Sequence, residues 1–131
     1  MEDLDHESIC VAPKIITPGT PDEVIAAVLA STPASLVVAG HTHMQFDRVV
    51  AGRRMVNAGS VGMPYARRPG AYWVLIGPDV ELRRTTNDFR AAAESVRRTQ
   101  YPEREDFAKH LVRPLVPEEA IPTFERMAGR D

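Results

Sequence analysis

The sequence predicts a mixed α/β (α+β) domain, and three observations carry this prediction. The apolar run at residues 36–39 is short and β-branched, which is typical of a buried strand. Pairs of strand-like segments around residues 51–52 and 77–79 are separated by turns that contain glycine. Apolar residues at helical spacing come before and after these strands.

Composition favours one small globular domain. The chain has 131 residues, of which 44% are hydrophobic and 26% charged, so wholesale disorder is excluded. The net charge of −2 does not support nucleic-acid binding. The single cysteine, Cys10, excludes an internal disulfide framework and a CxxC zinc site. No apolar run is long enough to span a membrane, and the acidic start lacks a signal-peptide core, so we expect a cytoplasmic protein.

The first elements follow from local signals. Residues 1–13 show no clear period and are expected to form a loose lead-in. A helix is predicted after Thr20, a suitable cap, with Pro21 in the first helical position. This helix should end at Thr32-Pro33, and its apolar face should contain residues 24, 27, 28 and 29.

Strands dominate the middle of the chain. The strand at 36–39 has no polar face, so we expect it to be buried on both sides. Further strands are expected at 46–50, 54–56, 71–76 and 80–83, with a tight loop at 57–64.

A helical tail is predicted from residue 87 to residue 131. Its first helix should be capped by Asn87 or Thr86, with an apolar face of Phe89, Ala92, Ala93 and Val96. Weaker helices are expected at 103–111 and 118–127. No domain boundary is evident, so residues 1–131 are treated as one domain whose tail packs on the sheet.

The sharpest chemical signal is Gly40-His41-Thr42-His43, directly after the apolar strand. Open α/β sheets often place their chemistry at this end of a strand. Neutral imidazole is the commonest metal ligand, so His41 and His43 could each bind one ion of a two-metal centre. The alternative is a pair of loop histidines that only cap backbone groups.

Two blocks of residues resemble the closing motifs of the calcineurin-like metallophosphoesterases, most closely the small bacterial single-domain phosphodiesterases. One block is the strand with Gly40-His41-Thr42-His43, and the other is Asn57-Ala58-Gly59-Ser60-Val61-Gly62. The likeness covers roughly residues 15 to 100. It implies the carboxy-terminal half of a β-sandwich flanked by helices, and therefore a partial domain.

The resemblance also implies an enzyme that hydrolyses phosphodiesters or phosphomonoesters with two divalent ions, such as manganese, iron or zinc. His41 and His43 match two of the family's metal ligands. His6 matches a third through a degraded motif, in which Ile9 stands where proline is expected. Asn57 and Ser60 are candidates for orienting the histidine loop or for contacting substrate. No catalytic residue is assigned.

The family's Asp-x-His, Gly-Asp-x-x-Asp and Gly-Asn-His-Asp/Glu blocks are not found in this sequence. Asp47 lies near the histidines, but we interpret it as a solvated hairpin residue. Two cations need carboxylates to offset their charge, so we expect weak metal binding and little or no turnover by this chain alone. A half sandwich should expose an apolar face made by Leu36, Val37, Val38, Val74 and Ile76. We therefore expect a homodimer or a complementing amino-terminal half.

Two other functions stay open at this point. The chain could be a non-catalytic binding or scaffold module derived from the same fold, or it could bind one zinc ion through His6, His41 and His43. Residues Arg53, Arg54, Arg67 and Arg68 could attract phosphate, although solvated surface positions are the simpler reading. His110 is interpreted as a surface residue.

Overall fold

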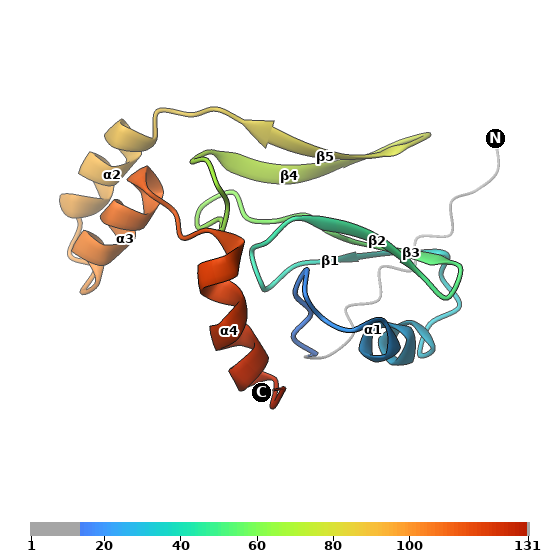
Figure 1. Cartoon of the computed structure of the whole chain (residues 1–131). Helices are drawn as coiled ribbons and strands as arrows, with labels where there is room; N and C mark the ends of the chain where they lie inside the picture. Colours follow the sequence, from blue (N-terminus) through green and yellow to red (C-terminus); the bar gives the residue numbers. More distant parts are fainter. Residues whose placement is uncertain (1–13, 131) are drawn as a thin grey trace.

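The computed structural model describes residues 14–130, which form a mixed α+β fold (Figure 1). In chain order the elements are α1 (Asp22–Leu29), β1 (Leu36–Ala39), β2 (Phe46–Val50), β3 (Arg53–Asn57), β4 (Ala71–Ile76), β5 (Val80–Thr85), α2 (Phe89–Arg97), α3 (Arg104–Val112) and α4 (Pro117–Met127). The expected strands and helices are therefore all present. None of the helices between residues 14 and 130 combines the length and the apolar character needed to cross a bilayer.

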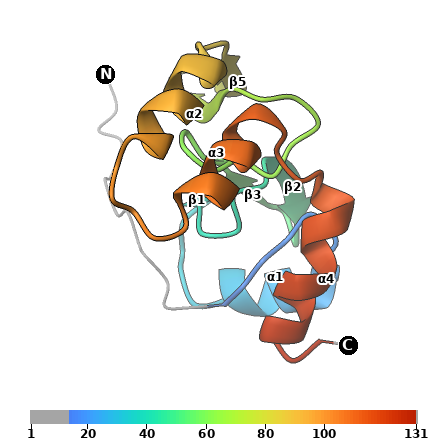
Figure 2. The ribbon, with the colours of Figure 1, turned by 90° about the vertical axis from the view of Figure 1, so that its left-hand side faces the viewer.

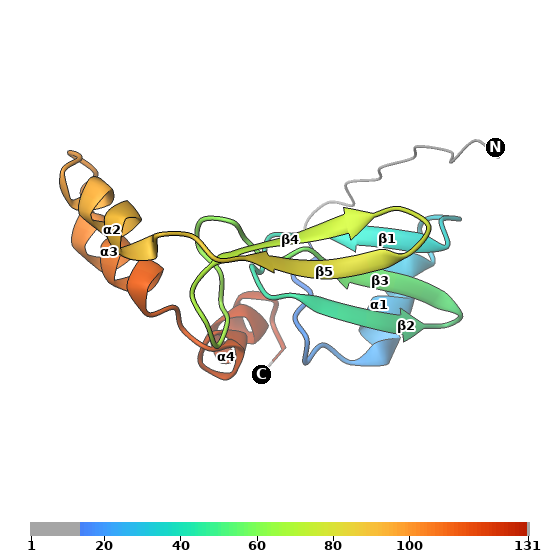
Figure 3. The same ribbon diagram turned by 90° about the horizontal axis from the view of Figure 1, so that it is seen from above.

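The strands form two small sheets. In the first sheet, β3 lies in the middle, with β1 parallel to it and β2 antiparallel on its other side. The second sheet is the antiparallel hairpin of β4 and β5. Figures 1 and 3 show this hairpin stacked over one face of the first sheet, with α1 on the opposite face.

The hydrophobic core lies between α1 and the first sheet. The helix contributes Ile25, Val28 and Leu29, and the β2–β3 hairpin contributes Phe46, Val50 and Met55. Alternation along the strands places these hairpin side chains on one face of the sheet. The core face predicted for α1 is partly wrong, because Ile25 is fully buried whereas Ala27 is exposed.

The start of α1 also differs from the prediction. Helix α1 begins at Asp22 with Pro21 as its flanking residue, and no side chain caps it. The Thr20 hydroxyl instead accepts a hydrogen bond from the Thr17 amide, at 2.8 Å. Thr20 therefore closes the turn that leads into the helix and is not its cap.

Strand β1 is not buried on both sides, contrary to expectation. Val38 is 40% exposed, and β1 is an edge strand whose only partner among residues 14–130 is β3. Of the five residues predicted to form an exposed apolar face, Leu36, Val37 and Val74 are half-buried, and Val37 packs against the core on the α1 side. Leu75 and Ile76 at the end of β4 are exposed as well.

Gln45 joins the two sheets. Its side-chain amide donates hydrogen bonds to the carbonyls of Ala58, Trp73 and Arg83, at 3.0–3.1 Å. Next to it, Gly59 has a φ of +83°, and an added Cβ would lie 2.8 Å from Gln45 Cγ and 2.9 Å from Tyr72 Cβ. The close approach of the hairpin to the loop after β3 therefore requires glycine here.

The tail forms two separate units. Helix α2 is capped by Asp88, whose carboxylate accepts from the Ala91 amide, and not by Asn87 or Thr86. Helices α2 and α3 pack mainly against each other, and Figures 1 and 3 show the pair beyond one end of the sheets, the end that faces the viewer in Figure 2. The expectation that the whole tail packs on the sheet is wrong for this pair. Helix α4 returns to the loop that follows β1.

Candidate functional site

The loop that follows β1 turns sharply at both of its histidines. His41 has a φ of 73° and His43 a φ of 58°, so both residues adopt the left-handed region that non-glycine residues rarely occupy. Thr42 between them is buried, whereas His41 is exposed and His43 half-buried. Such strained backbone persists only where surrounding contacts hold it, and it is concentrated at functional sites.

Thr42 and Asn57 provide those contacts. The Thr42 hydroxyl donates to the Ile16 carbonyl at 2.9 Å. The fully buried Asn57 amide donates to the Gly40 carbonyl at 2.9 Å and to the Thr42 hydroxyl at 3.2 Å. Its carbonyl oxygen accepts from the Gly59 amide at 2.9 Å. Asn57 thus ties the histidine loop to the glycine loop after β3, which suits the orienting role predicted for it.

The glycine loop reaches His43 through residues 60–65. The Ser60 hydroxyl accepts from the Met63 amide at 3.0 Å, so Ser60 shapes this loop from within. The Tyr65 amide then donates to the His43 carbonyl at 3.0 Å. Ser60 lies near the histidine loop but acts on it only through Met63 and its neighbours.

One hydrogen bond determines which nitrogen of His43 carries the proton. His43 Nδ1 lies 2.9 Å from the Met63 carbonyl, which can only accept a hydrogen bond. Nδ1 must therefore carry the hydrogen, and Nε2 of the neutral ring keeps its lone pair. Metal-binding histidines are commonly held in this way, with the second ring nitrogen bonded to a carbonyl.

Both histidines border one aromatic cluster, made of Tyr65 and Phe124. The His43 ring is stacked on Tyr65, with centroids 5.8 Å apart and planes at 22°. The His41 ring lies edge-on to Phe124 at 6.3 Å, and Tyr65 and Phe124 are 5.7 Å apart. The structure thus places the two histidines beside neighbouring rings of the same cluster.

The donor set in residues 14–130 does not by itself fit a metal centre. No group of three or more histidine, cysteine, aspartate or glutamate side chains within this range could hold an ion. Asp47, the nearest acidic residue in sequence, instead accepts two hydrogen bonds from the Arg54 guanidinium, at 2.9 and 2.6 Å. This contact lowers the pKa of Asp47. His6 lies outside the described residues, so the structure does not place it.

Most of the arginines considered as phosphate contacts are already engaged. Arg53 donates to the carbonyls of Leu29 and Thr32, which lie at the end of α1. Arg54 is paired with Asp47, and Arg67 is paired with Glu118 on α4. Arg53, Arg54 and Arg67 therefore act in the structure as links between elements.

The sequence did not indicate four residues, namely Tyr65, His110 and Phe124 beside the histidine loop and Glu125, the neighbour of Phe124 on α4, which accepts from Thr17 and Arg130. His110 is half-buried, and its Nε2 donates to the Pro64 carbonyl at 2.9 Å, so the interpretation as a surface residue is wrong. Its ring also lies edge-on to Tyr65 at 5.4 Å. Of these four, only Tyr65 could have been suspected from the sequence, because it directly follows the glycine loop. The positions of the other three depend on how α3 and α4 fold back onto the rest of the chain.

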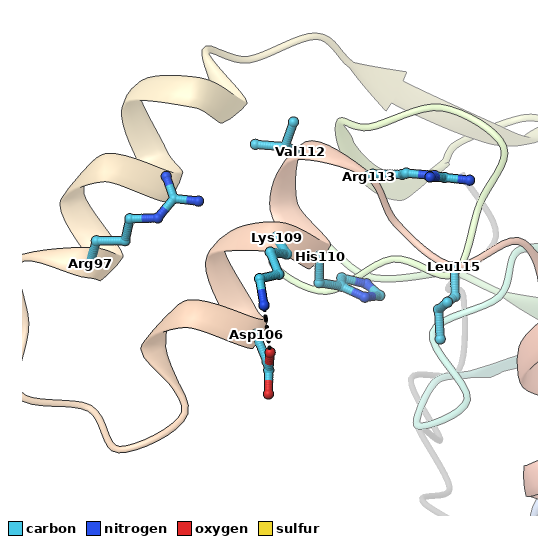
Figure 4. A pocket seen from close by; sticks show the side chains of 7 residues that line it. All are labelled: Arg97, Asp106, Lys109, His110, Val112, Arg113 and Leu115. Atoms are coloured by element: carbon cyan, nitrogen blue, oxygen red, sulfur yellow. Dashed lines mark hydrogen bonds and ion pairs between the residues drawn. The ribbon is translucent and has the colours of Figure 1, made fainter.

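An open groove of about 570 Å³ lies beside this cluster (Figure 4). It is lined by Arg97, Asp106, Lys109, His110, Val112, Arg113 and Leu115. Arg97 is paired with Glu94 and Glu105, and Lys109 with Asp106. The charges of Arg97 and Lys109 are therefore offset, and the groove meets the aromatic cluster around the histidines through His110, whose ring lies edge-on to Tyr65.

Both a protein family and two solved structures resemble this chain. The family model of the calcineurin-like phosphoesterase superfamily domain matches residues 4–77. A hypothetical protein from Pyrococcus horikoshii OT3 has a similar structure, with a TM-score of 0.64 and 20% identity over 77% of this chain and 41% of its own. A metallophosphoesterase from Sphaerobacter thermophilus matches with a TM-score of 0.57 and 21% identity, over 69% of this chain and 47% of its own. A comparison with curated proteins found no match.

Proposed function

The chain belongs to the calcineurin-like phosphoesterase superfamily, and we propose that it supplies the two-histidine part of a metal-dependent phosphoesterase site. The observation that carries this proposal is the loop after β1. There the buried Asn57 and Thr42 hold two histidines in left-handed backbone, and a carbonyl contact leaves His43 Nε2 with its lone pair. The proposed substrates are phosphodiesters or phosphomonoesters, the ester class of this superfamily.

The remaining metal donors have to come from outside residues 14–130. His6 is the candidate within the chain itself. Carboxylates are also needed, because two neutral imidazoles cannot offset the charge of two divalent cations. This chain alone is therefore proposed to be weakly active or inactive. It spans less than half of each of the two solved structures described above.

The partner we propose is a polypeptide that carries these carboxylates and adds to the edge of β1. This edge is apolar, exposes Val38, and leads directly into the histidine loop. A second copy of the chain would bring the same histidines without the missing carboxylates, so it fits the chemistry less well.

We also propose a cytoplasmic location. Its support is that a chain with one cysteine cannot form an internal disulfide framework.

The test is hydrolysis of bis(p-nitrophenyl) phosphate with added Mn²⁺. The purified chain is compared with the chain mixed with, or fused to, the part of the Sphaerobacter thermophilus metallophosphoesterase that it does not match. We expect turnover only in the complemented sample, with loss of activity in the His41→Ala and His43→Ala variants. A folded, complemented chain that shows no turnover, or turnover that survives both substitutions, would overturn the proposal.

The non-catalytic binding module is the second candidate. It is favoured by the absence of a three-donor group within residues 14–130 together with the open edge of β1. The same samples separate the two functions. A stable complex whose formation is indifferent to Mn²⁺ and to both histidine substitutions, and which hydrolyses nothing, supports the module.

A further inference from the structure

We propose that Tyr65 is a positioning residue whose ring holds the His43 imidazole in the orientation that leaves Nε2 free. This inference rests on the proposed function in one respect only, namely that His43 Nε2 serves to bind a metal ion. It extends the site to the tail, because Tyr65 itself is held by side chains from α3 and α4.

The first support is the way residues 63–65 bracket His43. The Met63 carbonyl accepts from the ring, and the Tyr65 amide donates to the His43 backbone carbonyl at 3.0 Å. A single hydrogen bond to Nδ1 fixes one point of the imidazole but leaves the ring plane free to tilt. The stacked Tyr65 ring, at 22° to the imidazole plane, restricts that second movement.

The second support is that Tyr65 is held from two further directions. His110 of α3 meets it edge-on at 5.4 Å, and Phe124 of α4 does so at 5.7 Å. The backbone on either side of Tyr65 is also tied to the tail. Pro64 accepts a hydrogen bond from His110, and the Ala66 amide donates to the Leu115 carbonyl at 2.9 Å. The stacked ring therefore cannot swing away without breaking several contacts.

The third support concerns the hydroxyl of Tyr65. It makes no hydrogen bond to any side chain or carbonyl of residues 14–130, and since no polar side-chain atom in this range is buried without a partner, the hydroxyl is open to solvent while the residue as a whole is half-buried. The tyrosine therefore acts through its ring and not through its hydroxyl. Two substitutions at this position test the ring separately from the hydroxyl. Tyr65→Phe keeps the stacking surface, whereas Tyr65→Leu removes it.

The test measures the tautomer of His43 in the metal-free, ¹⁵N-labelled chain at a pH where the imidazole is neutral. Long-range ¹H–¹⁵N correlation spectra distinguish a ring protonated at Nδ1 from one protonated at Nε2. We expect the parent chain and Tyr65→Phe to carry the proton on Nδ1. In Tyr65→Leu the Nδ1–H population should fall roughly twofold as the ring is released. The matched control is Tyr101→Leu, since Tyr101 is exposed and its ring, among the rings of residues 14–130, meets only that of Phe107, edge-on.

A folded Tyr65→Leu chain with the parent's His43 tautomer would overturn the proposal, as would a Tyr65→Phe chain that changes it equally. If Tyr65→Leu does not fold, Phe124→Leu removes the support behind Tyr65 and must shift the His43 population in the same direction. An unchanged population in that folded variant counts against the proposal. Because no metal or substrate is present, the result is independent of whether the chain takes part in hydrolysis.

Discussion

The Glu125 carboxylate of α4 accepts a 2.8 Å hydrogen bond from the Thr17 hydroxyl, 108 positions earlier in the chain. Arg130 donates to the same carboxylate and also to the Ile15 carbonyl. This cluster fixes α4 against the segment that leads into α1. The neighbouring residue of α4, Phe124, reaches the histidine loop, so the cluster also sets the position of the aromatic rings around the site.

Glu125 should make stability depend on pH. Its pKa is lowered chiefly by the hydrogen bond from Arg130, with a further contribution from Thr17. A carboxyl group whose pKa is lower in the folded state stabilises the fold above its unfolded pKa, and this contribution is lost as the pH falls through the folded pKa. The free energy of unfolding should therefore fall more steeply between about pH 5 and pH 3 in the parent than in Glu125→Gln.

Urea denaturation at several pH values checks this prediction. Glu118→Gln is the matched control, because Glu118 lies on the same helix and its ion pair with Arg67 is exposed to solvent, so that it adds little to stability. The control should follow the parent curve. Parallel curves for the parent and Glu125→Gln would show that this carboxylate does not contribute as we expect.

Asn57→Ala should destabilise the protein strongly. The substitution removes three hydrogen bonds, a buried one to the Thr42 hydroxyl and partly buried ones to the Gly40 carbonyl and the Gly59 amide. We expect a loss of about 2–4 kcal/mol in the free energy of unfolding, measured by urea denaturation. Asn87→Ala, at an exposed position, should change it by less than about 0.5 kcal/mol. A similar small effect of Asn57→Ala would contradict the anchoring role.

Two glycine substitutions separate backbone strain from steric clash. Gly52 has a φ of +74° with open space around it, so Gly52→Ala should cost about 1 kcal/mol. Gly59 has a similar φ, but an added Cβ would collide with Gln45 and Tyr72. Gly59→Ala should therefore cost about 1–3 kcal/mol more than Gly52→Ala. Thermal or urea denaturation measures both costs. Equal losses in the free energy of unfolding would mean that the β4–β5 hairpin moves away from residue 59 without cost.

Removing metal should not change the stability of the chain. Residues 14–130 contain no group of three donors that could hold an ion, and we therefore expect this part to stay folded when metal is removed. A chelator such as EDTA should leave the thermal midpoint within about 1 °C of its starting value. A clear fall in the midpoint, reversed by adding Mn²⁺ or Zn²⁺, would reveal a tight site that uses residues beyond this range.

The strand that ends in the histidine loop could be predicted because its signals are local. An apolar run, a glycine and two histidines follow one another directly, and the glycine-rich loop lies only one hairpin later. The exposure of Val38 could not be predicted from the same run. The sequence of a strand with two apolar faces does not show whether another part of the fold covers both of them.

The side chains around the histidines depend on contacts between distant parts of the chain. Phe124 lies in a helix whose spacing only predicts an apolar face, and nothing local indicates that it meets His41. The incorrect expectation for His110 has the same origin, because the carbonyl it contacts belongs to Pro64, 46 positions earlier in the chain. The error for Thr20 is local, since its hydroxyl accepts from the Thr17 amide and closes a turn instead of capping the helix.

The return of α4 to the beginning of the fold has a consequence for synthesis on the ribosome. His41 and His43 leave the exit tunnel well before Phe124 and Arg130, so their loop emerges without the rings and ion pair that later support it. Contacts between such distant segments also form slowly, since a long loop has to close first. The histidine loop should therefore acquire its final shape late in folding, after the strands and α1 have already assembled.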